Sequence, residues 1–562
     1  MENDDQPRRQ RETWIAAAIA AVASLIAFLY YFHRGEIMLY GDAVAHINIA
    51  RRVLDSREPG IAQLGTVWLP LPHILQIPFI WMDPLWRSGI AGSIPSMVAY
   101  VLGAVGIFRL LRVRTTQYTA WVGFAIYAGN PSLLYMQSTA MTESIFLAAI
   151  IWAVFYTDEF KRGVFPPSYG YGLPATIPAW RALERCGMCL AAAIFTRYDG
   201  WVFAAIVGIL NISVFLRWRK AEPQNPGSRR MARSLATFVI FCALVPVFWL
   251  AHNYHLSGRP LDWLNGPYSA KAIEARTSQP GTPPYPGKNS MKVASQYFIK
   301  SGLMNMSEGK TAPWILAFAL LGTIIVASHI GRLGALLLFW IPLPFYAYSV
   351  AYGSVPIFLP TWWPYSYYNV RYGLELLPMF SVMIALAVMS VSGIRVKRLG
   401  AIFSALAVVV VGYAYLSSWR GDSHYYDWGV RAPWPGPICY REALVNSRTR
   451  LGVEKWLADE IKLIPPDSSV VMYTSQYVGA LQRAEFPLKR VVNESTFVVW
   501  QAALSAPAGV ADYTIAIDND PVAQAVSQNP YGLTLVDRRA VDREPEIAIY
   551  KSSVVDHSGL KR

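Results

Sequence analysis

Long apolar runs separated by short basic patches dominate this chain. The first run, Thr13–Phe32, follows Arg8, Arg9 and Arg11. It is about twice as long as the apolar core of a signal peptide. We therefore expect an uncleaved transmembrane helix whose arginines keep the N-terminus in the cytoplasm.

The later apolar runs also fit transmembrane helices. Each loop assigned to the cytoplasm carries Lys or Arg beside the spans, so a count of about eleven is self-consistent. The run at 186–196 is too short to cross unless its helix starts earlier or ends deeper. The expected spans after the first are 90–111, 118–134, 144–157, 186–196, 201–216, 235–251, 314–328, 335–352, 374–393 and 399–416.

An odd number of spans places the tail, from Ser417 onward, on the extracytoplasmic face. The tail alternates strand-like segments (468–474, 511–517 and 546–550) with helix-like ones (448–464 and 521–527). This pattern predicts a small α/β module. It contains no Gly-rich phosphate loop and no nucleophile elbow, so we expect an accessory role. The predicted domains are therefore a transmembrane domain, 1–416, and an extracytoplasmic domain, 417–562.

Composition supports a multi-pass membrane protein. Hydrophobic residues make up 54% of the 562 residues and charged residues 15%, whereas about a quarter is usual in soluble proteins. The net charge of +14 comes mostly from Lys and Arg beside the apolar runs. That distribution sets topology in a membrane, so nucleic acid is not an expected partner.

Asp42 is the most informative single residue. It follows the first span and opens the amphipathic segment 42–56, at the extracytoplasmic surface. A carboxylate there can act as a base on an acceptor that arrives from outside while the other reactant sits in lipid. The alternative is that Asp42, after Gly41, caps this helix. His46 lies on the same helical face, and an apolar stripe that can rest on the membrane is formed by Ala43, Ile47, Ala50 and Leu54.

A second motif follows in the same loop. The residues from Trp68 to His73 read Trp-x-Pro-x-Pro-His and lead into the next apolar segment. The order of these features resembles that in the GT-C superfamily of polyprenyl-phosphate-sugar glycosyltransferases: a first span, an acidic loop, an amphipathic helix and then this motif. The nearest branches are the protein O-mannosyltransferases and the aminoarabinose transferases. The resemblance covers the layout of about the first 400 residues, and its specific motifs lie in a few loops.

The resemblance implies a bundle of about eleven transmembrane helices with a soluble C-terminal domain on the outer face. In this family an acidic residue of the first outer loop is the catalytic base, and Asp42 matches that position. Many relatives carry an acidic pair there, whereas this chain has Ala43 next. Glu143, which ends the loop 135–143, resembles a second acid of the family. The alternative is a helix N-terminal carboxylate with Thr142 as the cap.

Two arginines are candidates for binding the phosphate of the donor, because Arg binds phosphate through two parallel hydrogen bonds. Arg371 and Tyr372 are similar to an Arg-Tyr pair that precedes the penultimate helices of the family. Arg197 ends another span. The alternatives are snorkelling to lipid headgroups for Arg371 and a local pair with Asp199 for Arg197.

The resulting hypothesis is an inverting glycosyltransferase of the plasma membrane, mannosyltransferase-like in its resemblance. It would move a hexose or pentose from a polyprenyl phosphate to a glycan, glycolipid or protein. Asp42 and Glu143 are the catalytic candidates, and Arg371 and Arg197 the phosphate-binding ones. The substrate-binding candidates are His46, Trp68, His73 and Tyr372.

No cofactor is expected, and a metal site at His252, His255 and Asp262 is the weaker alternative.

The rival function is a transporter or lipid flippase. That class predicts internal repeats and charges near helix centres, and the sequence contains no convincing repeat.

Overall fold

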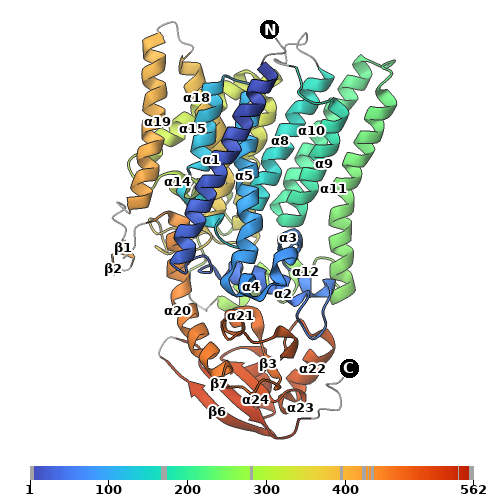
Figure 1. The fold of residues 1–562 in the computed structure, drawn as a ribbon, viewed down its shortest axis with the longest axis vertical. Coiled ribbons are helices and arrows are strands. Elements are labelled where there is room, and N and C mark those ends of the chain that lie inside the picture. The colour runs from blue at the N-terminus through green and yellow to red at the C-terminus, as the bar shows by residue number, and fades with distance from the viewer. Residues whose placement is uncertain are drawn as a thin grey trace. The chain divides into compact units, whose positions relative to one another are not determined.

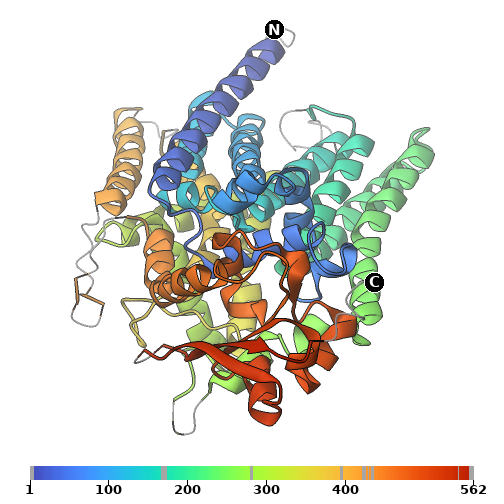
Figure 2. The ribbon, with the colours of Figure 1, turned by 60° about the horizontal axis from the view of Figure 1, so that its bottom comes forward.

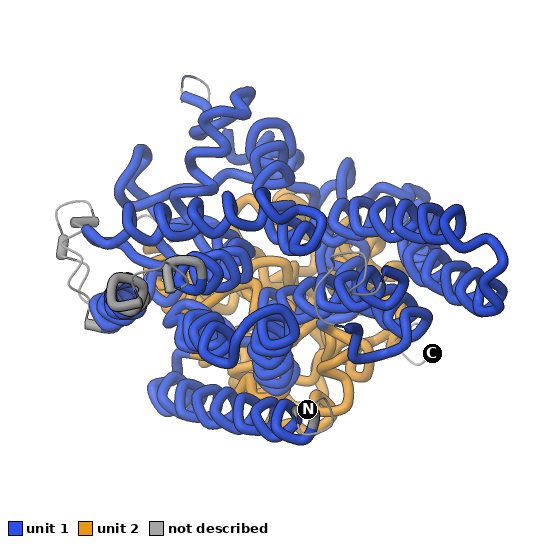
Figure 3. The backbone as a smooth tube through the Cα atoms, turned by 90° about the horizontal axis from the view of Figure 1, so that it is seen from above, with its two compact units in different colours: residues 1–36, 66–72, 93–443 blue, residues 37–65, 73–92, 444–562 orange. Residues whose placement is uncertain are grey.

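The chain divides into two compact units (Figure 3). Unit 1 comprises residues 1–36, 66–72 and 93–443, and unit 2 comprises 37–65, 73–92 and 444–562. The boundary predicted at 416/417 is a different division, because it separates a catalytic part from an accessory part by function. That boundary stays a prediction. The structure, a computed structural model, describes residues 5–165, 174–278, 281, 283–392, 397–420, 426–427, 430–431, 436–541 and 544–555.

Unit 1 is built from helices, and its longest ones run side by side (Figure 1). α8 packs against α9, α9 against α11, and α15 against α18. Two short strands of two residues each, β1 (Tyr426–Asp427) and β2 (Val430–Arg431), pair antiparallel near the C-terminal end of the unit. The helices are α1 (Asp5–His33), α5 (Ile90–Arg112), α6 (Gln117–Ala128), α7 (Pro131–Met136), α8 (Glu143–Val164), α9 (Ala179–Thr196), α10 (Asp199–Ala221), α11 (Ser228–Ser257), α12 (Asp262–Asn265), α13 (Ala270–Thr277), α14 (Met291–Met306), α15 (Ala312–Ser328), α16 (Ile330–Leu333), η3 (Gly334–Trp340), α17 (Pro342–Tyr352), η4 (Val370–Leu376), α18 (Leu377–Ser392) and α19 (Lys397–Arg420).

Several of these helices suit a membrane. Six helical stretches within the described residues are long and apolar enough to cross one. α11 leaves large apolar side chains such as Leu244 and Phe248 more than half exposed, as expected of a lipid-facing surface. The protein is therefore a multi-pass membrane protein, and the count of about eleven spans stays a prediction. The six stretches are Pro7–His33, Ile90–Arg112, Asp199–Ala221, Ser228–Ser257, Ile330–Tyr352 and Val370–Met389.

Two expected spans differ in detail. The span predicted at 118–134 is broken into α6 and α7, because Asn130 accepts a hydrogen bond from the Leu133 backbone N–H and Pro131 starts a new helix. The span that seemed too short at 186–196 belongs to α9, which begins at Ala179. Its 18 residues give a length of about 27 Å.

Unit 2 contains a five-stranded sheet with the order β4-β3-β5-β7-β6. β3 is parallel to β4 and β5, and β7 is antiparallel to β5 and β6. α24 packs against β5. Figure 2 shows the strands of this sheet, in orange and red, together with neighbouring helices of the tail. The elements of unit 2 are α2 (Gly41–Arg52), η1 (Ile61–Leu64), α3 (Leu71–Ile80, from residue 73 onward), α4 (Asp83–Ser88), β3 (Val470–Met472), α21 (Thr474–Arg483), η5 (Leu488–Arg490), β4 (Val491–Val492), α22 (Phe497–Ser505), α23 (Pro507–Val510), β5 (Tyr513–Ile517), α24 (Pro521–Gln528), β6 (Leu533–Arg539) and β7 (Ile547–Ser552).

The predicted α/β character of the tail is confirmed, since β3, β5, β7 and α24 lie where strands and a helix were expected. β5 is buried along its whole length, Thr514 included. α20 (Ile438–Ile461) begins ten residues before the expected helix, in unit 1, and ends in unit 2.

The amphipathic helix after the first span exists as α2. Its buried face packs against α21, and Asn48 on α2 donates a hydrogen bond to Gln482 on α21 (2.9 Å). Three residues of the predicted apolar stripe, Ala43, Ile47 and Ala50, are buried in the protein. Leu54, predicted in the stripe, lies beyond the end of α2 and is exposed.

Candidate functional site

Charged side chains from helix ends gather in unit 1, and we call them the Arg197–Arg371 cluster. Two guanidinium groups and four carboxylates make it up, and all four carboxylate side chains are at most 4% exposed. Its members are Glu143 at the start of α8, Arg197 after α9, Asp199 at the start of α10, Arg371 and Glu375 in η4, and Glu442 in the part of α20 that belongs to unit 1.

Arg197 lies at the centre of several acceptors. Its Nε is 3.2 Å from Asp199 Oδ2, and its Nη2 is 3.2 Å from Glu375 Oε1. Nη1 lies 3.5 Å from Glu143 Oε1 and donates a hydrogen bond to Thr142 Oγ1 (3.1 Å). Every nitrogen of this guanidinium therefore faces an acceptor of the protein itself.

Arg371 bridges two other members. Its Nε is 3.3 Å from Glu143 Oε1, and its Nη1 is 3.8 Å from Glu442 Oε1. The backbone N–H of Arg371 donates to Glu442 Oε2 (3.1 Å). Neither oxygen of Glu143 accepts a hydrogen bond from any residue that the structure describes. Glu143 is thus held between two guanidinium groups by charge, without a hydrogen bond from either.

Tyrosines complete the surroundings of the two arginines. The ring of Tyr372 has the guanidinium carbon of Arg197 at 5.1 Å and that of Arg371 at 5.2 Å from its centroid, within cation–π range. Tyr346 accepts a hydrogen bond from Arg197 Nη2 (2.7 Å), and its hydroxyl lies 2.6 Å from Glu375 Oε1 and 3.0 Å from Asp199 Oδ2. Tyr346 therefore joins these two acids to Arg197.

Close packing fixes the elements that carry these groups. A Cβ on Gly373 would lie 2.4 Å from backbone atoms of Ser301 and Gly302, so only glycine lets η4 approach α14 this closely. The loop before Glu143 is held by α5, because Ser93 and Ser96 donate hydrogen bonds to the carbonyls of Ser138 (2.8 Å) and Met141 (2.9 Å). The cluster therefore rests on a rigid frame of helix ends.

The structure brings together four residues singled out from the sequence: Glu143, Arg197, Arg371 and Tyr372. The local pair of Arg197 with Asp199, the alternative for that arginine, is also present. Thr142 stands at the cap position of α8 but makes no capping hydrogen bond within the helix, so the capping alternative for Thr142 is wrong. Its hydroxyl accepts from Arg197 instead.

Sequence reasoning missed two members of the cluster, Glu375 and Glu442, and the neighbouring Tyr346. Glu375 falls inside an expected span, and an ionisable residue there is a signal of function that could have identified it. Tyr346 and Glu442 carried no comparable signal.

Trp68 belongs to unit 1 and is partly exposed. The segment before it is held by two hydrogen bonds: Thr66 Oγ1 donates to Asp262 Oδ2 (2.7 Å), and Tyr198 Oη donates to the Val67 carbonyl (2.9 Å). Tyr198 lies between Arg197 and Asp199 in the chain, so Trp68 is anchored next to the loop that carries both.

Asp42, His46 and His73 belong to unit 2. Asp42 lies in the first turn of α2, partly exposed. The alternative that Asp42 caps this helix is wrong, because α2 begins one residue earlier, at Gly41, and Tyr40 occupies the cap position.

The two histidines meet. His46 Nδ1 lies 2.8 Å from His73 Nε2, and both side chains are buried. Burial, reinforced by His46 and Arg52, lowers the pKa of His73 well below its ordinary value. His73 is therefore neutral near pH 7, and a neutral imidazole can either donate or accept in the hydrogen bond with His46.

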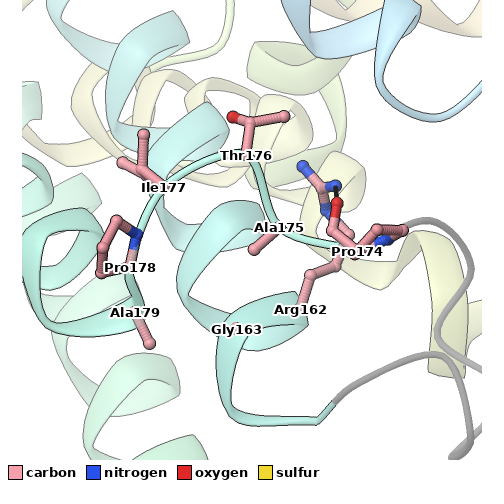
Figure 4. A pocket seen from close by; sticks show the side chains of 8 residues that line it. All are labelled: Arg162, Gly163, Pro174, Ala175, Thr176, Ile177, Pro178 and Ala179. Atoms are coloured by element: carbon pink, nitrogen blue, oxygen red, sulfur yellow. Dashed lines mark hydrogen bonds between the residues drawn. The ribbon is translucent and has the colours of Figure 1, made fainter. Parts of the chain in front are cut away.

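A cavity of about 410 Å³ lies at the other end of α8, where Arg162 and the segment Pro174–Ala179 line it (Figure 4). The guanidinium of Arg162 is directed at protein acceptors: Asp158, Glu159 and the Pro174 carbonyl. Thr176 donates its hydroxyl to Glu159 (2.9 Å). This cavity contains none of the residues predicted for the site.

Among the residues that the structure describes, no three His, Cys, Asp or Glu side chains lie together in a way that could hold a metal ion. His252, His255 and Asp262 therefore do not form the metal site considered as an alternative. His252 stacks on Trp249 instead (ring centroids 4.9 Å apart).

No protein-family model and no curated protein matches the chain. Its fold is similar to that of ArnT from Cupriavidus metallidurans bound to undecaprenyl phosphate (TM-score 0.54, 13% identity, 96% of this chain and 98% of that one). The apo state of ArnT from that organism gives a TM-score of 0.53 at 12% identity, over 97% and 99% of the two chains. The archaeal oligosaccharyltransferase AglB from Archaeoglobus fulgidus, in complex with an inhibitory peptide and a dolichol-phosphate, matches with a TM-score of 0.45 at 11% identity. This match covers 90% of the present chain and 69% of AglB.

At these identities the likeness to ArnT concerns the fold alone. It extends over nearly the whole of both chains, the tail included. The fold class expected from the sequence, a helical membrane bundle with a small C-terminal α/β part, is confirmed. The chain has the fold of ArnT.

Proposed function

We propose that this protein is a membrane glycosyltransferase that moves a sugar from a polyprenyl-phosphate-linked donor to an extracytoplasmic acceptor, with inversion at the anomeric carbon. The observation that carries the proposal is the gathering of Glu143, Arg197 and Arg371 at helix ends within the GT-C fold. ArnT, which has this fold, is an aminoarabinose transferase with a structure bound to undecaprenyl phosphate.

In the proposed reaction a hydroxyl or amine of the acceptor attacks the anomeric carbon of the donor. Asp42 takes the proton of that group as the new bond forms. The bond between the anomeric carbon and the phosphate oxygen breaks, and its electron pair leaves with the polyprenyl phosphate. Positive groups fixed beside that phosphate stabilise the negative charge that grows on it.

Arg371 is the better candidate for the phosphate. Two carboxylates approach its side chain at 3.3 and 3.8 Å, longer than charge-assisted hydrogen bonds of about 2.7–2.9 Å. A phosphate beside Arg371 can accept the shorter, charge-assisted hydrogen bonds that these two carboxylates do not. Arg197, whose nitrogens all face protein acceptors, would mainly hold Glu143, Asp199 and Glu375 in place. Tyr372 lies against both arginines and would bind substrate beside them.

In this proposal the N-terminus is cytoplasmic, the tail is extracytoplasmic and the membrane is the plasma membrane. His46, His73 and Trp68 are proposed substrate-binding residues. The sugar is a hexose or pentose, and the acceptor is a glycan, glycolipid or protein.

The rival proposal is a transporter or lipid flippase. Such proteins carry ionisable residues near the middle of membrane helices, along a substrate path. Here Glu143 and Asp199 are the first residues of α8 and α10, and Arg197 directly follows α9. A cluster formed by helix ends favours a site at one surface of the membrane, and so an enzyme.

The deciding experiment incubates purified protein with radiolabelled undecaprenyl-phosphate mannose or aminoarabinose and a membrane extract that supplies acceptors. A transferase releases undecaprenyl phosphate, and Asp42→Asn abolishes that release while insertion and folding stay intact. A flippase leaves the donor uncleaved. Full release by the Asp42→Asn variant would refute the assignment of the base.

A further inference from the structure

The first turns of α20 are buried within unit 1, although they follow the last predicted span. Cys439 and Glu442 have no exposed surface, and Arg441 is 3% exposed. Arg441 forms an ion pair with Glu308, and Cys439 donates a hydrogen bond to Asn305 Oδ1 (3.1 Å). The start of the tail is therefore an integral part of unit 1, not a linker.

Glu442 occupies a particular place in that packing. One of its oxygens accepts from the backbone N–H of Arg371, and the other lies 3.8 Å from Nη1 of the same residue. One carboxylate thus contacts Arg371 at both its main chain and its side chain. Such a contact restricts where the guanidinium can point, because one buried carboxylate holds both the main chain and the side chain of the same residue.

A second side chain of α20 contacts the segment that leads to Asp42, within unit 2. Arg450 Nη2 donates hydrogen bonds to the carbonyls of Met38 (3.0 Å) and Leu39 (2.8 Å). Its Nη1 donates to Glu454 Oε1 (2.7 Å), one turn farther along α20. These carbonyls lie directly before α2, so Arg450 fixes the entry of the chain into the helix that carries Asp42 in its first turn.

We propose that α20 is a positioning element of the reaction: Glu442 orients Arg371, and Arg450 orients the segment that carries Asp42. The inference rests on the proposed function and assigns to the tail a part in catalysis instead of an accessory role. Because the two side chains act on different partners, their loss has different kinetic consequences. Loss of Glu442 weakens donor binding, and loss of Arg450 slows the chemical step.

The first test measures binding of tritiated undecaprenyl phosphate to purified Glu442 variants. We expect Glu442→Ala to raise Kd about tenfold and Glu442→Gln about threefold, because the amide oxygen of Gln still accepts from the Arg371 N–H. The matched control is Glu308→Ala, which removes the neighbouring ion pair of α20 with Arg441. It should lower thermal stability as Glu442→Ala does, with Kd within twofold of the wild type.

The second test measures kcat and KM for release of undecaprenyl phosphate from the radiolabelled donor. Arg450→Gln should lower kcat about tenfold with donor KM within twofold, and Arg450→Lys should recover part of the loss. Arg483→Gln is the control, because Arg483 contacts the same Glu454 (3.4 Å) but no carbonyl before α2. It should keep kcat within twofold of the wild type.

The outcomes separate the two proposals. A wild-type protein that neither binds undecaprenyl phosphate nor releases it from a donor overturns the proposed function. If the wild type binds and releases it, an unchanged Kd in both Glu442 variants, or equal changes in Glu442→Ala and Glu308→Ala, overturns the role of Glu442. An unchanged kcat in Arg450→Gln overturns the role of Arg450.

Discussion

The two ends of α8 carry two buried charge clusters that differ in how completely they are paired. At its C-terminal end lies what we call the Arg114–Arg162 cluster: Arg114, Asp158, Glu159 and Arg162, each with a side chain at most 1% exposed. At its N-terminal end, about 25 Å away along the helix axis, Glu143 belongs to the Arg197–Arg371 cluster.

The Arg114–Arg162 cluster is balanced and hydrogen-bonded. Asp158 accepts from both arginines. Glu159 accepts from Arg162 and also from the Thr176 hydroxyl and two backbone N–H groups. In the Arg197–Arg371 cluster four carboxylates surround two arginines, and Glu143 accepts no hydrogen bond from a described residue. The first arrangement is held by direct hydrogen bonds between its charged groups, whereas in the second Glu143 contacts both arginines without a hydrogen bond.

The largest effect is expected from breaking the balanced cluster. Asp158→Asn leaves two buried guanidinium groups with one full carboxylate, which should lower the free energy of unfolding by about 3–5 kcal/mol. Thermal unfolding in detergent measures this. Protein that remains folded should keep kcat/KM for donor cleavage within about twofold, and a selective loss of kcat/KM would contradict the structural role.

Breaking the unbalanced cluster should instead remove activity. We expect Arg371→Gln to lower kcat/KM for release of undecaprenyl phosphate about 100- to 1,000-fold, since a donor that stabilises transition-state charge is typically worth that much. The melting temperature should change far less than in Asp158→Asn. Activity near that of the wild type would show that Arg371 does not bind the donor phosphate.

Glu143→Gln sharpens the contrast on α8 itself. Because Arg197 and Arg371 keep Asp199, Glu375 and Glu442 as carboxylate neighbours, the neutral isostere of Glu143 should lower the free energy of unfolding less than Asp158→Asn does. We expect kcat to fall about tenfold while the affinity for undecaprenyl phosphate is kept or improved, because Glu143 competes with phosphate for Arg371. Weaker phosphate binding in this variant would contradict that competition.

A smaller effect is expected at His46 and His73, a buried polar pair that belongs to neither cluster. The pKa of His73 is lowered by burial, His46 and Arg52, so the unfolded chain takes up a proton that the folded chain excludes. The contribution of neutral His73 to stability is complete above about pH 6.5 and is lost as the pH falls, by at most about 1.4 kcal/mol per pH unit.

Unfolding curves measured between pH 7.5 and 5.5 check this predicted loss of stability at low pH. His73→Gln should flatten the pH dependence, whereas His329→Gln, at an exposed position in unit 1, should leave it as in the wild type. Equal slopes in wild type and His73→Gln would contradict the lowered pKa.

Sequence reasoning located charged residues at the ends of apolar runs but not their partners. Glu143, Arg197 and Arg371 stand out because a charge beside a span is visible in the chain. Their assembly depends on packing: Arg371 meets Glu442 across 71 residues of sequence, and no local pattern encodes that contact. From the sequence, Tyr346 is an ordinary member of an expected span, because an apolar run does not reveal which of its side chains faces a buried acid. The GT-C resemblance supplied the fold, since the layout of spans and loops is itself the signal.

The most direct test of the account is an experimental structure of the protein with undecaprenyl phosphate bound. We predict that the phosphate lies within hydrogen-bond distance of Arg371, at the N-terminal end of α8. A phosphate bound instead in the cavity beside Arg162, or one with no contact to Arg371, would contradict the account.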